Sequence, residues 1–147
     1  MKWNKTIGVI VFMVASLVPC SGHHIAVIVN KANNTDTVTS AHLAQFFRAE
    51  TKKWADGGSV VLVIDRSSTS QMATLQKLNH MTAAELKAFL AAHAADIKQL
   101  NSDADVLEFV QSNPGAIGLI EVHSLDSRVK IVKVDGKLPL EEGYLSH

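Results

Sequence analysis

The chain has 147 residues, the length of one ordinary domain. It carries 14 Lys and Arg against 14 Asp and Glu, so no net charge draws it to nucleic acid or to anionic membrane lipid. Hydrophobic residues make up 47% of the sequence, which is enough for a packed core and excludes intrinsic disorder of the whole chain.

Residues 1–22 have the pattern of a secretory signal peptide. Lys2 and Lys5 give a positive start, and residues 7–18 form an almost unbroken apolar run that is short for a membrane span. Cleavage after Gly22 would leave small residues at the −1 and −3 positions. We therefore expect a periplasmic or secreted protein with no membrane contact once it is processed. The alternative is an uncleaved N-terminal membrane anchor.

Cys20 is the single cysteine of the chain. A lipoprotein would be acylated at such a cysteine, but the residue directly before an acylated cysteine is Gly, Ala or Ser, and here it is Pro19. Lipid anchoring at Cys20 is therefore the less favoured alternative. A single cysteine also has no partner for an internal disulfide, so the domain depends on its packed core.

Beyond residue 22 the sequence alternates between strand and helix patterns. Apolar, β-branched runs bounded by turn residues predict strands at residues 25–29, 60–64, 116–122 and 128–134. Apolar stripes preceded by capping residues predict helices that begin near residues 40, 70, 82 and 102. We expect residues 96–100 to continue or lightly interrupt the helix that begins near residue 82.

This order of elements predicts the α/β class. Strands that alternate with helices give a mixed or largely parallel sheet with helices on both faces. The sequence contains no internal repeat, low-complexity tract or linker, so we expect a single domain over residues 23–134. Residues 135–147 are mostly polar, and we expect this tail to be loosely held.

The candidate functional site lies where the buried strand at residues 60–64 passes into the next helix. A strand, a hydroxyl-rich turn and a helix together aim backbone N–H groups and the positive end of the helix at one point. An Arg in the turn adds a fixed positive charge that can bind an oxyanion through two parallel hydrogen bonds. The residues that we assign to this oxyanion site are Arg66, Ser67, Ser68, Thr69 and Ser70.

A purely structural interpretation of these residues is also open. Serines and threonines before a helix commonly cap it, and an Arg in a loop is commonly a solvated surface charge. Trp54, in the loop before the central strand, is most simply a packing residue, with ligand stacking as the alternative.

Four short motifs follow one another along the chain: Leu43-x-x-Phe46-Phe47, Trp54-x-Asp56-Gly57-Gly58, Val63-x-x-Arg66-Ser67 and Asn113-Pro114-Gly115-Ala116-Ile117-Gly118. With their spacing, they resemble the periplasmic phosphate-binding proteins of ABC transporters, and most of all the short, one-domain relatives of these proteins. The resemblance covers residues 25–133. It implies a fold like one lobe of a type 2 periplasmic binding protein, with phosphate or a similar oxyanion as the ligand.

In the full-length family, two lobes close on phosphate like a clamshell. The resemblance here covers only the second lobe, which the strand at residues 25–29 enters and the strand at residues 116–122 leaves. The other lobe, which supplies part of the phosphate shell, has no counterpart in this chain. The resemblance therefore implies a half-site that holds its anion weakly.

The half-site also departs from the family pattern, which reads Arg-Ser-Asp-Gly-Ser-Gly-Thr. Both glycines are replaced, and glycine is the residue that lets backbone N–H groups approach an anion closely. Replacement of the final Thr removes a hydroxyl donor. The corresponding residues here are Arg66, Ser67, Ser68, Thr69, Ser70, Gln71 and Met72.

Two other kinds of site find less support. The seven histidines show no i, i+4 pair of the kind that binds a metal on a helix, so we expect no metal and no cofactor. Ser67, Ser68 and Ser70 could be nucleophiles of a hydrolase, but no Gly-x-Ser-x-Gly turn surrounds them. We therefore expect a protein that is not an enzyme.

Two functional hypotheses follow. In the first, the chain is an exported module that binds phosphate or a similar oxyanion at a half-site. In the second, the anion site has decayed, and the chain is an interaction domain whose open face is covered by a second protein or a second copy of itself.

Overall fold

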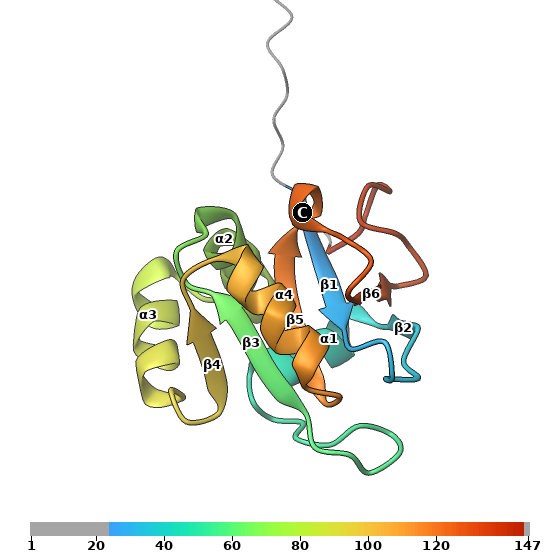
Figure 1. Cartoon of the computed structure of the whole chain (residues 1–147). Helices are drawn as coiled ribbons and strands as arrows, with labels where there is room; N and C mark the ends of the chain where they lie inside the picture. The colour runs from blue at the N-terminus through green and yellow to red at the C-terminus, as the bar shows by residue number, and fades with distance from the viewer. Residues whose placement is uncertain (1–23, 146–147) are drawn as a thin grey trace, which may run out of the picture.

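The computed structural model describes residues 24–145 (Figure 1). The expected signal peptide at residues 1–22, including Cys20, lies outside the described residues. Within residues 24–145, no helix is both long and apolar enough to cross a membrane.

The centre of the domain is a five-stranded sheet with the order β4-β3-β5-β1-β6. Strand β3 runs parallel to both β4 and β5, whereas β1 runs antiparallel to β5 and β6, so the sheet is mixed. A separate parallel pair joins β2 to β7. The strands are β1 (Ile25–Val29), β2 (Thr37–Val38), β3 (Val61–Asp65), β4 (Ile97–Leu100), β5 (Ala116–Glu121), β6 (Lys130–Ile131) and β7 (Lys133–Val134).

Helices cover both faces of the sheet, which confirms the predicted α/β class (Figure 1). Apolar residues of α1, α2 and α3 form one hydrophobic core with one face of the strands, and α4 forms a second core on the opposite face. Both faces of β3 are buried, as its continuous apolar run predicts. The helices are α1 (Ser40–Phe47), α2 (Thr69–Asn79), α3 (Ala83–Ala92) and α4 (Asp103–Ser112), and a 3₁₀ turn follows β5 at Val122–Ser124.

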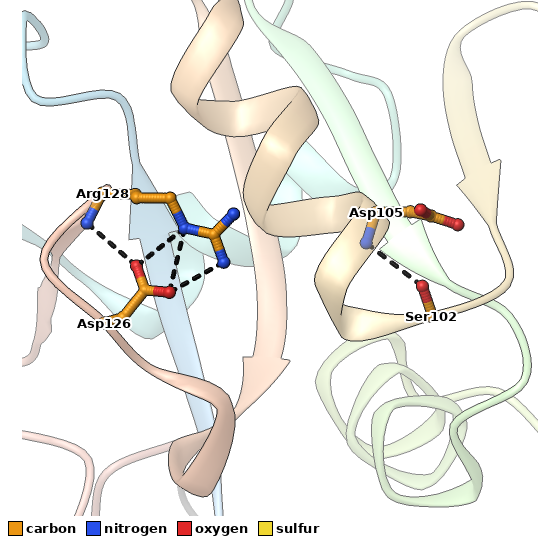
Figure 2. A network of polar contacts seen from close by, with 4 residues as sticks. All are labelled: Ser102, Asp105, Asp126 and Arg128. Carbon is orange, nitrogen blue, oxygen red and sulfur yellow. Dashed lines mark hydrogen bonds and ion pairs between the residues drawn. The ribbon is translucent and has the colours of Figure 1, made fainter.

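Each α-helix begins at a capping side chain. Thr39, Ser68, Thr82 and Ser102 each accept a hydrogen bond from a backbone N–H group in the first turn of their helix. Figure 2 shows the cap of α4, where the N–H of Asp105 donates to the Ser102 hydroxyl at 3.1 Å. These caps explain why the helix starts could be located from sequence.

Gly118, in the middle of β5, is where helix α4 comes closest to the sheet. A Cβ atom there would lie 2.9 Å from a methyl group of Val63 and 3.1 Å from one of Val106. The glycine therefore lets α4 pack against the sheet. Trp54 has a packing role as well, because its ring is buried and its indole N–H donates to the carbonyl of Gly115 at 3.0 Å.

Residues 97–100 form a strand, which corrects the expectation that they extend a helix. Strand β4 pairs in parallel with β3, with Ile97 opposite Leu62 and Leu100 opposite Asp65. Ile97 is buried in the core shared with α3. The free edge of β3 thus decides the conformation of this segment, and a local sequence pattern does not record that long-range pairing.

The C-terminal tail is more tightly held than expected. Tyr144 is buried, and its hydroxyl accepts a hydrogen bond from the N–H of Val27 at 2.9 Å and donates one to the carbonyl of Val132 at 3.0 Å. This burial raises the pKa of Tyr144 to about 12. Leu145 is buried beside it, so the expectation of a loosely held tail is wrong for these two residues.

We predict that Tyr144→Phe destabilises the fold by about 1–3 kcal/mol, because it leaves the buried N–H of Val27 and carbonyl of Val132 without a partner. Chemical denaturation measures the change. The control is Glu142→Gln, an exposed substitution in the same tail. Equal stability of Tyr144→Phe and the parent protein would show that the tail does not anchor the sheet.

Candidate functional site

The predicted site residues lie at the edge of the sheet where the parallel strands end. The turn after β3 carries them, with Asn101 after β4 on one side and Glu121 at the end of β5 on the other. Because β3, β4 and β5 run in the same direction, their carboxyl ends meet at this edge. In α/β sheets this is the edge at which ligands bind.

Arg66 is exposed and is held by the neighbouring strand end. Its backbone N–H donates to the carbonyl of Leu100 at 2.9 Å, and its side-chain Nε donates to Oδ1 of Asn101 at 2.9 Å. The side chain is therefore anchored at Nε, and its guanidinium group lies at the protein surface. This arrangement suits contact with a dissolved anion.

Ser67 is turned inward, toward a carboxylate of the protein itself. Its backbone N–H donates to Oδ1 of Asp65 at 2.9 Å. Its hydroxyl lies 2.5 Å from the same oxygen and 2.9 Å from the carbonyl oxygen of Asn101. Both donors of Ser67 are thus committed within the protein, which differs from the role that the sequence predicts for them.

Ser68 acts as the helix cap, as the structural interpretation of the turn predicts. Its hydroxyl accepts from the N–H of Gln71 at 3.2 Å and lies 3.4 Å from a carboxylate oxygen of Glu121. Thr69 and Ser70 are the first two residues of α2, where backbone N–H groups have no partner within the helix. These two N–H groups, the hydroxyls of Thr69 and Ser70 and the guanidinium group of Arg66 are the donors that remain for an anion.

A set of carboxylates, which the sequence analysis missed, surrounds the same turn. Gln71 is fully buried; its side chain accepts from the N–H of Asp65 at 3.0 Å and donates to Oδ1 of Asp103 at 2.9 Å. The other oxygen of Asp103 accepts from the N–H of Glu121 at 2.9 Å. The carboxylate of Glu121 in turn lies 3.2 Å from Nε2 of His123. Asp65, Asp103 and Glu121 therefore meet at one end of the sheet.

Asp103 carries the clearest electrostatic effect in this cluster. Burial raises the pKa of its carboxyl group, and the neighbouring Asp65 raises the pKa further, against the opposing effect of hydrogen bonds from Glu121 and Ser124. The raised pKa shows that negative charge is disfavoured at this position.

The sequence places an acidic residue close to the end of each of three strands, but this predicts a cluster only if β4 is recognised as a strand. Asp65 ends β3, Asp103 begins the helix after β4, and Glu121 ends β5. Three parallel strand ends bring such residues together. The sequence predicts no strand at residues 97–100, so the convergence of the three strand ends does not follow from it. Among residues 24–145, no group of three or more His, Cys, Asp or Glu side chains has the arrangement of a metal site.

Several solved structures of phosphate transport proteins share this architecture. An ABC-type phosphate transport receptor from Vibrio cholerae matches with a TM-score of 0.64 at 18% identity, over 79% of this chain and 48% of its own. A putative phosphate ABC transporter substrate-binding protein from Clostridium perfringens, solved with bound phosphate, gives 0.66 at 22% identity, over 79% and 46%. PstS from Borrelia burgdorferi gives 0.62 at 19% identity, over 79% and 49%.

The resemblance found in the sequence is thereby confirmed at the level of the fold. The chain has the fold of part of a phosphate-binding protein, and it spans less than half of the length of each of these three structures. At identities of 18–22% the likeness establishes the fold alone. No family model matches the sequence, and no curated protein is significantly similar to it.

The raised pKa of Asp103 predicts how stability depends on pH. A raised pKa in the folded state adds stability that is fully present below the ordinary aspartic acid pKa of about 3.9 and is lost as pH rises through the folded-state value. Asp103→Asn removes this dependence. The melting temperature of Asp103→Asn minus that of the parent protein should therefore increase from pH 4 to pH 7.

The control for this comparison is Asp105→Asn, which removes an exposed carboxyl group from the same helix turn. The loss of a hydrogen bond in Asp103→Asn shifts its stability by a constant amount and leaves the trend with pH intact. A difference that is flat or falls between pH 4 and pH 7 would contradict the electrostatic description of the cluster.

Proposed function

We propose that this chain is an exported module that binds phosphate or a similar oxyanion weakly, at a half-site formed by Arg66 and the first turn of α2. The observation that carries the proposal is the position of Arg66, anchored by Asn101 beside two unpartnered helix N–H groups at the carboxyl end of parallel strands. The likeness to phosphate-binding proteins supports the choice of ligand.

The geometry supports weak binding. Arg66 is exposed, and charge pairs in water contribute about 1 kcal/mol or less. The carboxylates of Asp65, Asp103 and Glu121 oppose a second negative charge at this edge. We therefore expect a dissociation constant near ~1 mM, which corresponds to about −4 kcal/mol.

The proposal includes a location outside the cytoplasm and a role without catalysis. The pattern of residues 1–22 supports export, and the similar solved structures are transport receptors or substrate-binding proteins. The turn serines have structural contacts, since Ser67 bonds to Asp65 and Ser68 caps a helix. The hydroxyl of Ser67 also donates to the carbonyl of Asn101, and no Gly-x-Ser-x-Gly turn presents a serine to a substrate.

Phosphate-dependent melting tests the half-site. With a dissociation constant near ~1 mM, ~10 mM phosphate should stabilise the protein by about 1.4 kcal/mol, a shift of a few degrees. Arg66→Ala should remove this shift, because it deletes the one cation of the turn. Sulfate at matched ionic strength shows whether the effect is specific for phosphate.

Arg128→Ala is the matched control for Arg66→Ala. Arg128 is also an exposed arginine, and Figure 2 shows its guanidinium group paired with the carboxylate of Asp126 at 2.8 Å. Arg128 lies beside Asn30, which directly follows β1 at the end where β1 pairs with the beginning of β5. Glu121, beside the Arg66 turn, lies at the other end of this strand pair. Loss of the phosphate effect in Arg128→Ala, or its retention in Arg66→Ala, would refute the site.

A second candidate function is an interaction domain with a decayed anion site. The inward bonds of Ser67 to Asp65 favour it, because they satisfy donors that an anion would otherwise receive. Mass in solution separates the two functions. A monomer with a phosphate-dependent melting temperature supports the half-site, whereas a dimer that protects Arg66 from solvent supports the interaction domain.

A further inference from the structure

A groove between α1 and α2 lies outside the turn described above. The two helices lie on the same side of the sheet and share one hydrophobic core (Figure 1). Between their outward sides is a hollow of about 680 Å³, within the usual range for small-molecule sites. Ser70 lines this hollow, but Arg66 does not.

The polar side chains of the groove are basic or neutral. Arg48, Lys77 and His80 line it, and none of its lining residues is acidic. The Nε atom of Arg48 lies 3.3 Å from a carboxylate oxygen of Glu50, which is outside the lining and fixes one side of the guanidinium group. The groove therefore has Lys77, His80 and an Arg48 that Glu50 partly neutralises, and no carboxylate in its own lining.

The rest of the lining combines small apolar side chains with the neutral polar side chains of Ser40, Gln45, Ser70 and Thr74. Ala41 and Ala44 on α1 face Ala73 on α2, with Leu78 and Leu145 beside them. Alanines on both helices keep the space between them open, since larger side chains would fill it. The groove thus joins an apolar surface to a basic one.

Helix stability explains part of this arrangement. Cations near a helix C-terminus are favoured by the helix dipole, and Lys77 occupies the last turn of α2. That effect accounts for each cation by itself. It does not account for three basic side chains, at the ends of two helices, that line one hollow with no acidic residue in its lining.

We propose that this groove binds a small organic anion, whose negative group pairs with Arg48 and Lys77 and whose apolar body packs against the alanines. The combination of an apolar surface with a few convergent polar groups is typical of a ligand site. Inorganic phosphate has no apolar body, so this ligand differs from that of the Arg66 half-site. The proposal goes beyond the oxyanion function and does not depend on it.

The test is a fluorescence titration of the protein with 8-anilinonaphthalene-1-sulfonate, an anion with a large apolar body. Lys77→Gln should weaken binding about threefold, the size expected for an exposed charge pair. Ala73→Leu should reduce binding without a change of charge, because leucine fills the hollow. Benzoate should displace the dye, and neutral benzamide should not.

Two variants on α3 control for general charge and for general apolar surface. Lys87→Gln and Ala84→Leu change exposed residues outside the groove, and both should bind like the parent protein. Arg66→Ala should bind the dye normally even where it abolishes the phosphate effect, so the two proposals fail separately. Absence of saturable dye binding, or an equal loss of dye binding in the groove variants and the control variants, would refute the proposed groove site.

Discussion

The buried side chain of Gln71 is the connection on which the arrangement of the turn depends. It joins the backbone of Asp65 at the end of β3 to the carboxylate of Asp103 at the start of α4. Asp103 extends the link to the backbone of Glu121 at the end of β5. In the family pattern this position is a glycine. A glycine would let backbone N–H groups approach an anion closely, whereas the glutamine links two elements through its side chain. The same hydrogen bonds hold carboxylates beside the turn.

That crosslink also determines how strongly the turn can hold an anion. The donors of Ser67 point to Asp65, and burial beside Asp65 raises the pKa of Asp103. Arg66 and the first N–H groups of α2 remain available, but they act at an open surface where water screens charge. These features support the proposed millimolar binding rather than tight binding. The groove between α1 and α2 has the opposite balance, with basic side chains and no acidic one in its lining.

Local signals in the sequence predicted most of the fold. Helix starts followed from capping side chains, because a cap acts between residues that are close together in the sequence. The strand at residues 97–100 and the burial of Tyr144 depend on partners distant in sequence, so no local pattern records them. Within the site, the exposed position of Arg66 could be predicted from the sequence. The carboxylates near Arg66 could be predicted only with the correct order of the parallel strands.

The most direct test of the half-site is an NMR titration of ¹⁵N-labelled protein with inorganic phosphate, because it reports each N–H group separately. The account predicts saturable shifts, with a midpoint near ~1 mM, at the amides of Thr69 and Ser70 and at the side-chain Nε–H of Arg66. Unchanged signals at these three groups over the same concentrations, or shifts confined to other parts of the domain, would contradict it.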